Sequence, residues 1–310
     1  MSRVHENPKI NGRSHEFHAD ATILSGELRL PFTQTIEPQA KSHLYHQGGY
    51  LSQHATEYRI EGVLSFQRAY TQVAGHPSGK PGHGWATLST TVVEGLNVLE
   101  VLTADRVVGQ IITEHPLEGY VPHISFLGTR FENLRIAGHP VHLEWDLNIL
   151  GERQANDHAY SKHEGVQGRV KKLVSGIGSL ISAVGEQDEL RSAVEGQYNR
   201  LSSNKVSQEE AVECSLVMDA KIEGAKGCFP GIPFGHIIRV PDFGTIELAK
   251  LSVCHDQFGR PGHYNENEKV PELTTVTLTM IDLKLGCAVE ADVPIGTGTS
   301  NGSTTKPGGN

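Results

Sequence analysis

Three polar residues that alternate along one predicted strand could bind a metal ion. His142, Glu144 and Asp146 follow one another at intervals of two residues. Because alternate side chains of a strand share a face, an imidazole and two carboxylates at this spacing could bind a divalent cation, with a further ligand from elsewhere. A strand whose face is simply solvent-exposed needs polar residues at the same positions, and this alternative stays open. The sequence therefore predicts His142, Glu144 and Asp146 as a candidate metal site.

Two further histidine pairs have the spacing HxxH. They are His15 with His18, and His43 with His46. Residues i and i+3 of a strand point to opposite faces, so such a pair chelates a metal only on a helix or in a turn. Both pairs lie in sequence that looks loop-like, and we expect surface imidazoles there.

Motifs for catalysis and for cofactor binding are weak. Cys254, His255 and Asp256 combine a nucleophile with a base, but adjacent residues of a strand cannot face one another. The sequence contains no GxSxG, GxGxxG or GxxxxGK[ST] motif. We therefore predict no catalytic residue and no cofactor-binding residue, and favour a protein that is not an enzyme.

The strand that would position His142 belongs to a chain dominated by β patterns. Apolar and polar residues alternate strictly over 139–150, which predicts a strand with one buried face. Other strands are expected at 58–70, 85–93, 212–222, 235–240, 244–253 and 273–289, separated by Gly- and Pro-rich turns. Two strands joined by a turn at 103–105 are expected within 98–112. This pattern predicts a mainly β fold, either an antiparallel β-sandwich or two packed β halves, with an inserted helical hairpin.

The inserted hairpin contains one sharply amphipathic helix at 166–184. Its apolar stripe is typical of a helix that packs on its own core, on a second copy of the chain or on a membrane surface. If the stripe mediates association, the contacting residues would be Val166, Val170, Leu173, Ile177, Leu180 and Val184. A weaker helix is expected at 186–201.

The predicted organisation is a single domain with polar ends. Residues 1–18 are predicted to be a disordered arm, and the Gly/Ser/Thr-rich residues 291–310 a disordered tail. Between them, residues 19–290 would form one β-rich domain with the helical insertion at 160–205.

Composition restricts the partners and the location. The 310 residues carry a formal net charge of −9, which argues against nucleic-acid binding. No apolar run is long enough for a membrane span, and no signal-like segment opens the chain, so a cytoplasmic protein is expected. The four cysteines form no CxxC pair, which favours free, buried thiols.

Several segments resemble one group of proteins. The stretches GHGWATLSTTVVEGLNVLEVLTADRVVGQI, FLGTRFENLRIAGHPV and FGHIIRVPDFG are similar to uncharacterised bacterial β-rich proteins. The resemblance spans most of residues 25–290 and implies one integrated domain with an insertion. It implies no activity and no site residue.

Three functional hypotheses follow. The first is a non-enzymatic binding or assembly module that associates, with itself or a partner, through a sheet face or the helical insert. The alternative is a metal-dependent enzyme on a β scaffold, either a hydrolase or a cupin-like oxygenase, with a divalent metal as its cofactor. The third is a membrane-active protein that uses the helix at 166–184.

Overall fold

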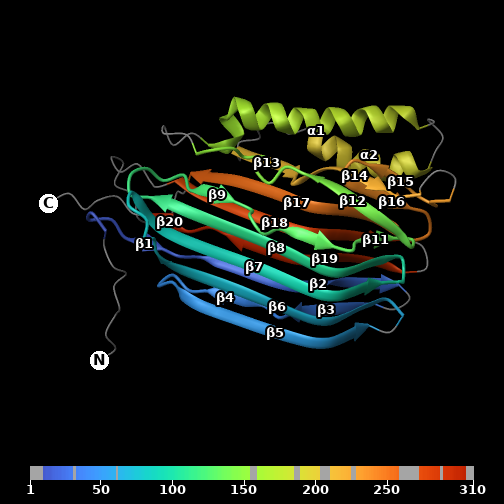
Figure 1. Ribbon diagram of the computed structural model, residues 1–310, viewed down its shortest axis with the longest axis horizontal. Helices are drawn as coiled ribbons and strands as arrows, with labels where there is room; N and C mark the ends of the chain where they lie inside the picture. Colours follow the sequence, from blue (N-terminus) through green and yellow to red (C-terminus); the bar gives the residue numbers. More distant parts are fainter. Residues whose placement is uncertain are drawn as a thin grey trace.

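The protein is a sandwich of two long antiparallel β-sheets (Figure 1). The computed structural model describes residues 10–30, 33–60, 62–153, 159–184, 189–202, 210–224, 228–257, 272–286 and 289–304. The predicted fold class, a mainly β sandwich with a helical insertion, is confirmed.

The first sheet is a meander of four long strands with shorter strands at one side. Its strand order is β14-β12-β11-β8-β7-β6-β5, and β9 and β10 also pair with β8. The strands are β5 Gly49–Ile60, β6 Leu64–Pro77, β7 His83–Val98, β8 Leu102–Pro116, β9 His123–Ser125, β10 Arg130–Glu132, β11 Arg135–Ile136, β12 His139–Trp145 and β14 Val217–Ile222.

The second sheet combines the two ends of the chain. Its order is β15-β16-β17-β18-β19-β2-β3, with β13 paired to β17 and β4 paired to β2. The strands are β2 Ala19–Leu30, β3 Gln34–Gln39, β4 Ser42–Leu44, β13 Glu210–Ser215, β15 Ile232–Phe234, β16 Ile237–Val240, β17 Gly244–Gln257, β18 Glu272–Leu285 and β19 Glu290–Ser300. A separate pair joins β1 His15–Glu16 to β20 Ser303–Thr304.

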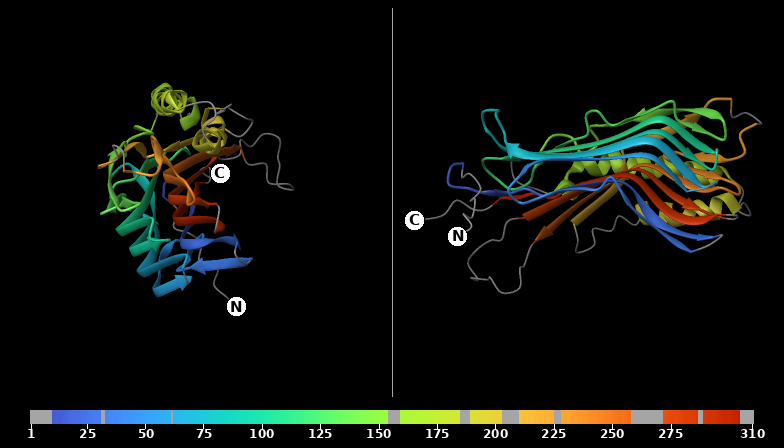
Figure 2. Two further views of the ribbon diagram at one scale, coloured as in Figure 1. Left: turned by 90° about the vertical axis from the view of Figure 1, so that its right-hand side faces the viewer. Right: turned by 90° about the horizontal axis from the view of Figure 1, so that it is seen from below.

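Both sheets bend at a row of residues that interrupt the hydrogen-bonded ladders. In the first sheet, Glu57 and Gly95 have positive φ values of 53° and 66° and lie opposite no regular ladder partner on β6. In the second sheet, Ala249 and Gly296, with φ values of 46° and 67°, flank Met280 in the same way. The register is the same on both sides of these positions, and the long strands of both sheets curve together (Figure 2). The sandwich therefore consists of two β halves with matching bends.

The helices lie along one long edge of the sandwich (Figures 1 and 2). A short 3-10 helix, η1 Tyr160–Lys162, leads into α1 Glu164–Ala183, and α2 Glu189–Ser202 follows. The apolar stripe of α1 contributes to the main core through buried Val166, Val170, Leu173, Ile177 and Ile181. Gly178 has no side chain where Tyr198 of α2 approaches, and an added Cβ would lie 2.9 Å from the tyrosine oxygen.

The ends of the chain differ from the prediction. The expected disordered arm is wrong for residues 10–18, because His15 pairs in β1 and Phe17 is buried. The expected disordered tail is wrong for residues 291–300, which form β19 at the centre of the second sheet. In this segment the buried Ala291, Val293 and Ile295 are followed by buried Gly298 and Ser300, and Thr297 and Thr299 between them are only partly buried. Residues 1–9 and 305–310 lie outside the described residues.

One predicted strand boundary is also wrong. A turn was expected at 103–105, but β8 continues without interruption through these residues. The turn lies instead at Leu99 and Glu100, which both have positive φ values, of 52° and 58°. Two-residue hairpin turns with positive φ usually contain Asn-Gly, whereas this turn consists of Leu and Glu, so the sequence carried no signal for it.

In the described part of the chain, no helix has the length and apolar character of a membrane span.

Candidate metal centre

The predicted metal-binding face on β12 does not gather its three residues. The ligand atoms of His142, Glu144 and Asp146 do not all lie within 4.8 Å of one another. Asp146 also follows the end of β12, after a register shift between Glu144 and Trp145. Its carboxylate accepts a hydrogen bond from the Asn148 backbone at 3.1 Å and closes a turn.

The other two residues of that face are already paired with residues across the sheet. His142 Nε2 lies 3.3 Å from a carboxylate oxygen of Glu223, and the Lys221 ammonium donates a hydrogen bond to Glu144. Both pairs are exposed, where ion pairs contribute little to stability. His142 and Glu144 are therefore exposed, and each is paired with a side chain of β14 or of the residue after it.

A different group of ligand atoms meets at the start of β2. One atom each from His18, Asp20 and His43 lies within 4.8 Å of the others. His18 Nε2 is 3.7 Å from Asp20 Oδ2, and His43 Nδ1 is 2.8 Å from Asp20 Oδ1. We refer to these three residues as the His-Asp-His cluster.

Strand alternation explains why His18 and Asp20 face the same side. Phe17, Ala19 and Ala21 point inward and are buried in a small apolar core, so the residues between them point outward. Burial of the three apolar side chains therefore makes the side chains of His18 and Asp20 point toward solvent.

The third residue is placed by strand pairing. His43 of β4 is the direct antiparallel partner of Asp20 on β2. Its neighbours Ser42 and Leu44 are buried, and the Ser42 hydroxyl lies 2.7 Å from the Thr71 hydroxyl of the opposite sheet. His18 just before β2, Asp20 on β2 and His43 directly across from Asp20 therefore converge on a backbone that is anchored on its inner side.

The C-terminal segment orients one ligand. The Asn301 backbone donates to the His18 carbonyl at 3.0 Å, and His18 Nδ1 hydrogen-bonds the Asn301 side-chain oxygen. A donor at Nδ1 leaves the lone pair at Nε2, the nitrogen that faces Asp20. Metal-binding histidines are commonly fixed by such an outer partner.

The chemistry of the donor set fits a divalent transition metal. Two imidazoles and one carboxylate bind Zn²⁺ or non-haem Fe²⁺, and three protein ligands leave coordination positions for water or substrate. Ligands about 2.0 Å from the ion would be about 3.4 Å apart in a tetrahedron, so modest side-chain rotation closes the cluster. The three side chains are 32% to 42% exposed and face solvent.

Two buried histidines lie behind the cluster. His15 stacks on Trp85 at 5.3 Å and lies 4.4 Å from His115, and both histidines are nearly inaccessible to solvent. Burial is the main cause that lowers the pKa of His15 to about 2, with smaller contributions from the neighbouring His115 and the Arg13 guanidinium, and burial lowers the pKa of His115 to about 3. These rings are neutral core residues, so the expectation of a surface imidazole is wrong for His15.

The remaining sequence motif has a structural role. His255 is buried, accepts the Tyr160 backbone N–H at 3.1 Å and lies 3.0 Å from the Thr274 hydroxyl. Among the cysteines, Cys214, Cys228 and Cys254 are free, but only Cys214 is buried, and burial raises its thiol pKa to about 12. Cys287 lies outside the described residues.

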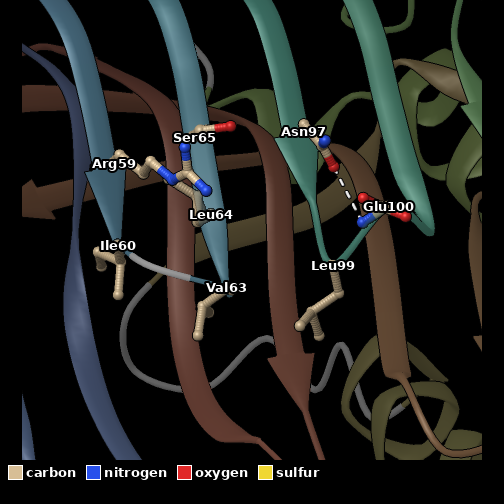
Figure 3. A pocket seen from close by; sticks show the side chains of 9 residues that line it. Arg59, Ile60, Val63, Leu64, Ser65, Asn97, Leu99 and Glu100 are labelled. Atoms are coloured by element: carbon tan, nitrogen blue, oxygen red, sulfur yellow. Dashed lines mark hydrogen bonds between the residues drawn. The ribbon is translucent and has the colours of Figure 1, made fainter.

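A shallow polar pocket lies at the opposite end of the first sheet (Figure 3). It has a volume of about 330 Å³ and is bordered by the β5–β6 and β7–β8 turns. Asn97 caps the second turn by accepting the Glu100 backbone N–H at 2.9 Å. Its polar groups come from turn residues, and no set of metal ligands borders it within the described residues.

The sequence contained a signal for the His-Asp-His cluster. His18-x-Asp20 has the same one-strand spacing as the predicted face on β12, and each of the two HxxH pairs donates one residue. Neither HxxH pair by itself contains more than one of the three ligands. The missing information was the pairing of β2 with β4.

Comparison with known proteins places the chain in a family without an assigned function. Residues 15–254 match the DUF8256 family, a domain of unknown function, and the chain belongs to this family. The match includes all three residues of the His-Asp-His cluster and ends before Asn301. No curated protein and no solved structure matches the chain.

Proposed function

We propose that this protein is a metal-binding module in which His18, Asp20 and His43 hold one divalent transition-metal ion. The convergence of three ligand atoms within 4.8 Å is the observation that carries the proposal. The cluster lies on two paired strands whose inner faces are buried, so its backbone is held in place before metal arrives.

The choice of ion follows from the donors. Nitrogen ligands favour Zn²⁺, Fe²⁺ or Co²⁺ over Ca²⁺ and Mg²⁺, which prefer oxygen. Both histidines must be neutral to coordinate, so protons compete with the metal and affinity should fall on acidification.

A titration with Co²⁺ tests the proposal. Tetrahedral Co²⁺ sites give strong visible absorption, and we expect saturation at one ion per chain. His43→Ala should abolish the spectrum, whereas the matched variant His142→Ala should leave it unchanged. Absence of saturable binding, or equal loss in both variants, would overturn the proposal.

The same geometry supports a metal-dependent hydrolase or oxygenase as a second candidate. Three protein ligands and a solvent-facing position are typical of catalytic rather than closed structural sites. A metal-bound water in that position would be the nucleophile of a hydrolase. Turnover of an activated ester by the Zn²⁺-loaded protein, lost in His43→Ala, would support this candidate, and equal rates in both proteins would exclude this hydrolysis.

Association through a sheet edge is a third candidate. β5 is twelve residues long, and none of the described strands pairs with its outer edge. Such an edge can accept another strand. The stripe of α1 supports association less well, because only Leu180, at 39% exposure, stays open to solvent, while Val184 is partly buried. Sedimentation velocity over a hundredfold concentration range tests this candidate, and a constant monomer mass would contradict self-association.

A further inference from the structure

A small pocket lies between α1 and β13, away from the residues of the metal centre. It has a volume of about 250 Å³ and is bordered by Ser161 of η1, by residues of α1 and by β13. Its walls include the apolar side chains of Val166, Val170 and Val212, which are 0%, 8% and 6% exposed. It is smaller than the pockets of 300–1,000 Å³ that bind drug-sized ligands.

One polar group in this pocket is left unsatisfied. The Ser161 hydroxyl is buried, with the residue 5% exposed, and has no hydrogen-bond partner among the residues that the structure describes. A buried hydroxyl that makes no hydrogen bond is destabilising. The neighbouring Gln167 is held in place by a hydrogen bond from its side-chain nitrogen to the Ser161 carbonyl at 2.8 Å. A bound ligand with an acceptor group would satisfy the hydroxyl.

A positively charged side chain, Lys171, also borders the pocket. Lys171 is exposed, borders the pocket and forms no ion pair with a residue in the described ranges. Val166 and Lys171 are five residues apart on α1, about 7.5 Å along the axis, and Ser161 precedes α1. The pocket therefore extends along the helix from a buried hydroxyl to a solvent-facing ammonium.

We propose that this pocket binds a medium-chain carboxylate that carries a polar group at its far end. The carboxylate would pair with Lys171, the methylene chain would contact the three valines, and the terminal group would accept a hydrogen bond from Ser161. A carboxylate without this terminal group would still contact the apolar walls, but it would leave the Ser161 hydroxyl without a hydrogen bond. The proposal is independent of the metal centre.

Two probes of equal length test the proposal. In the presence of a chelator, octanoate and 8-hydroxyoctanoate are titrated into the full chain and followed by calorimetry. We expect both to bind at one site per chain, with 8-hydroxyoctanoate about fivefold tighter, the usual worth of one neutral hydrogen bond. Ser161→Ala should remove this preference and leave octanoate binding unchanged.

Two further variants separate the site from general surface attraction. Lys171→Met should weaken both probes at least fivefold, whereas the adjacent Lys172→Met should change neither. Val170→Phe should fill the pocket and abolish binding, with folding checked by thermal melting. Absence of binding by either probe, or equal effects of the two lysine variants, would overturn the proposal.

Discussion

The start of β2 and the face of β12 have similar sequences and different chemistry. Each has a histidine and an acid two residues apart on one strand. On β12, the residues across the strand pair are Lys221 and Asp219, and Lys221 neutralises Glu144. On β2, the residue opposite Asp20 is His43, a further metal ligand. The comparison shows that the partner strand decides whether such a face becomes a site.

The two regions also differ in what lies beneath them. Behind β2 lies an apolar core that includes Phe17, Leu44 and Trp85, whereas side chains on both faces of β12 are only partly buried or exposed. A face backed by buried residues holds its ligands in fixed positions, and this lowers the cost of assembling a site.

The largest expected effect is on metal affinity. His43→Ala removes a direct ligand and should lower affinity for Zn²⁺ more than 100-fold, beyond the 10–100-fold cost of losing an outer-shell partner. Glu144→Gln on β12 should leave affinity within twofold of the unmodified protein. Competition with a chromogenic chelator measures both, and similar losses in the two variants would contradict the comparison.

The second effect is on stability in acid. His15 and His115 are neutral in the folded protein and titrate near pH 6.5 when unfolded, so the unfolded state binds more protons below pH 6.5. The contribution of these two histidines to the free energy of unfolding is fully present above pH 6.5. It is lost on acidification, by up to about 1.4 kcal/mol per pH unit for each histidine. Denaturant unfolding of metal-free protein at pH 7, 6 and 5 measures the slope.

Matched variants assign this slope to one region. His115→Gln should reduce it by about half, while His142→Ala on the exposed face of β12 should leave it unchanged. A slope that is insensitive to His115→Gln would mean that other groups cause the acid sensitivity.

A smaller effect is expected from the outer partner of His18. Asn301→Ala removes the hydrogen bond that orients the imidazole and should weaken Zn²⁺ binding about tenfold. Isothermal titration against Asn148→Ala, a change in the turn after β12, gives the control. Unchanged affinity would show that strand geometry alone orients His18.

The smallest predicted effect is a gain of binding on β12. Lys221 lies directly opposite His142. Lys221→His would remove the cation beside Glu144 and place two imidazoles and a carboxylate on neighbouring strands, as in the His-Asp-His cluster. We expect a weak second equivalent of Zn²⁺ in calorimetry. Its absence would indicate that the buried core behind β2 matters more than the set of ligands.

Local patterns predicted the elements better than their partners. The apolar stripe predicted a helix at 166–184, and the structure has α1 at Glu164–Ala183. The alternation after residue 139 predicted the strand that became β12. Both signals lie within one element, because side-chain period depends only on local backbone geometry.

Contacts between distant segments were not predictable in this way. β2 pairs with β19 and β4, which brings residues near 20, 43 and 300 together. The segment 291–300 looked like a flexible tail by composition, yet Val293, Ile295 and Ser300 are buried between neighbouring strands. Composition indicates how often segments of this kind are disordered, whereas the burial of this segment depends on the strands and the sheet that pack against it.

The most direct test of the account is the metal content of tag-free protein after purification and dialysis, measured by elemental mass spectrometry. We predict close to one equivalent of a divalent transition metal in the unmodified protein and in His142→Ala, and almost none in His43→Ala. Metal that is retained in His43→Ala but lost in His142→Ala, or no metal in any of the three even after reconstitution, would contradict the assignment of the site to His18, Asp20 and His43.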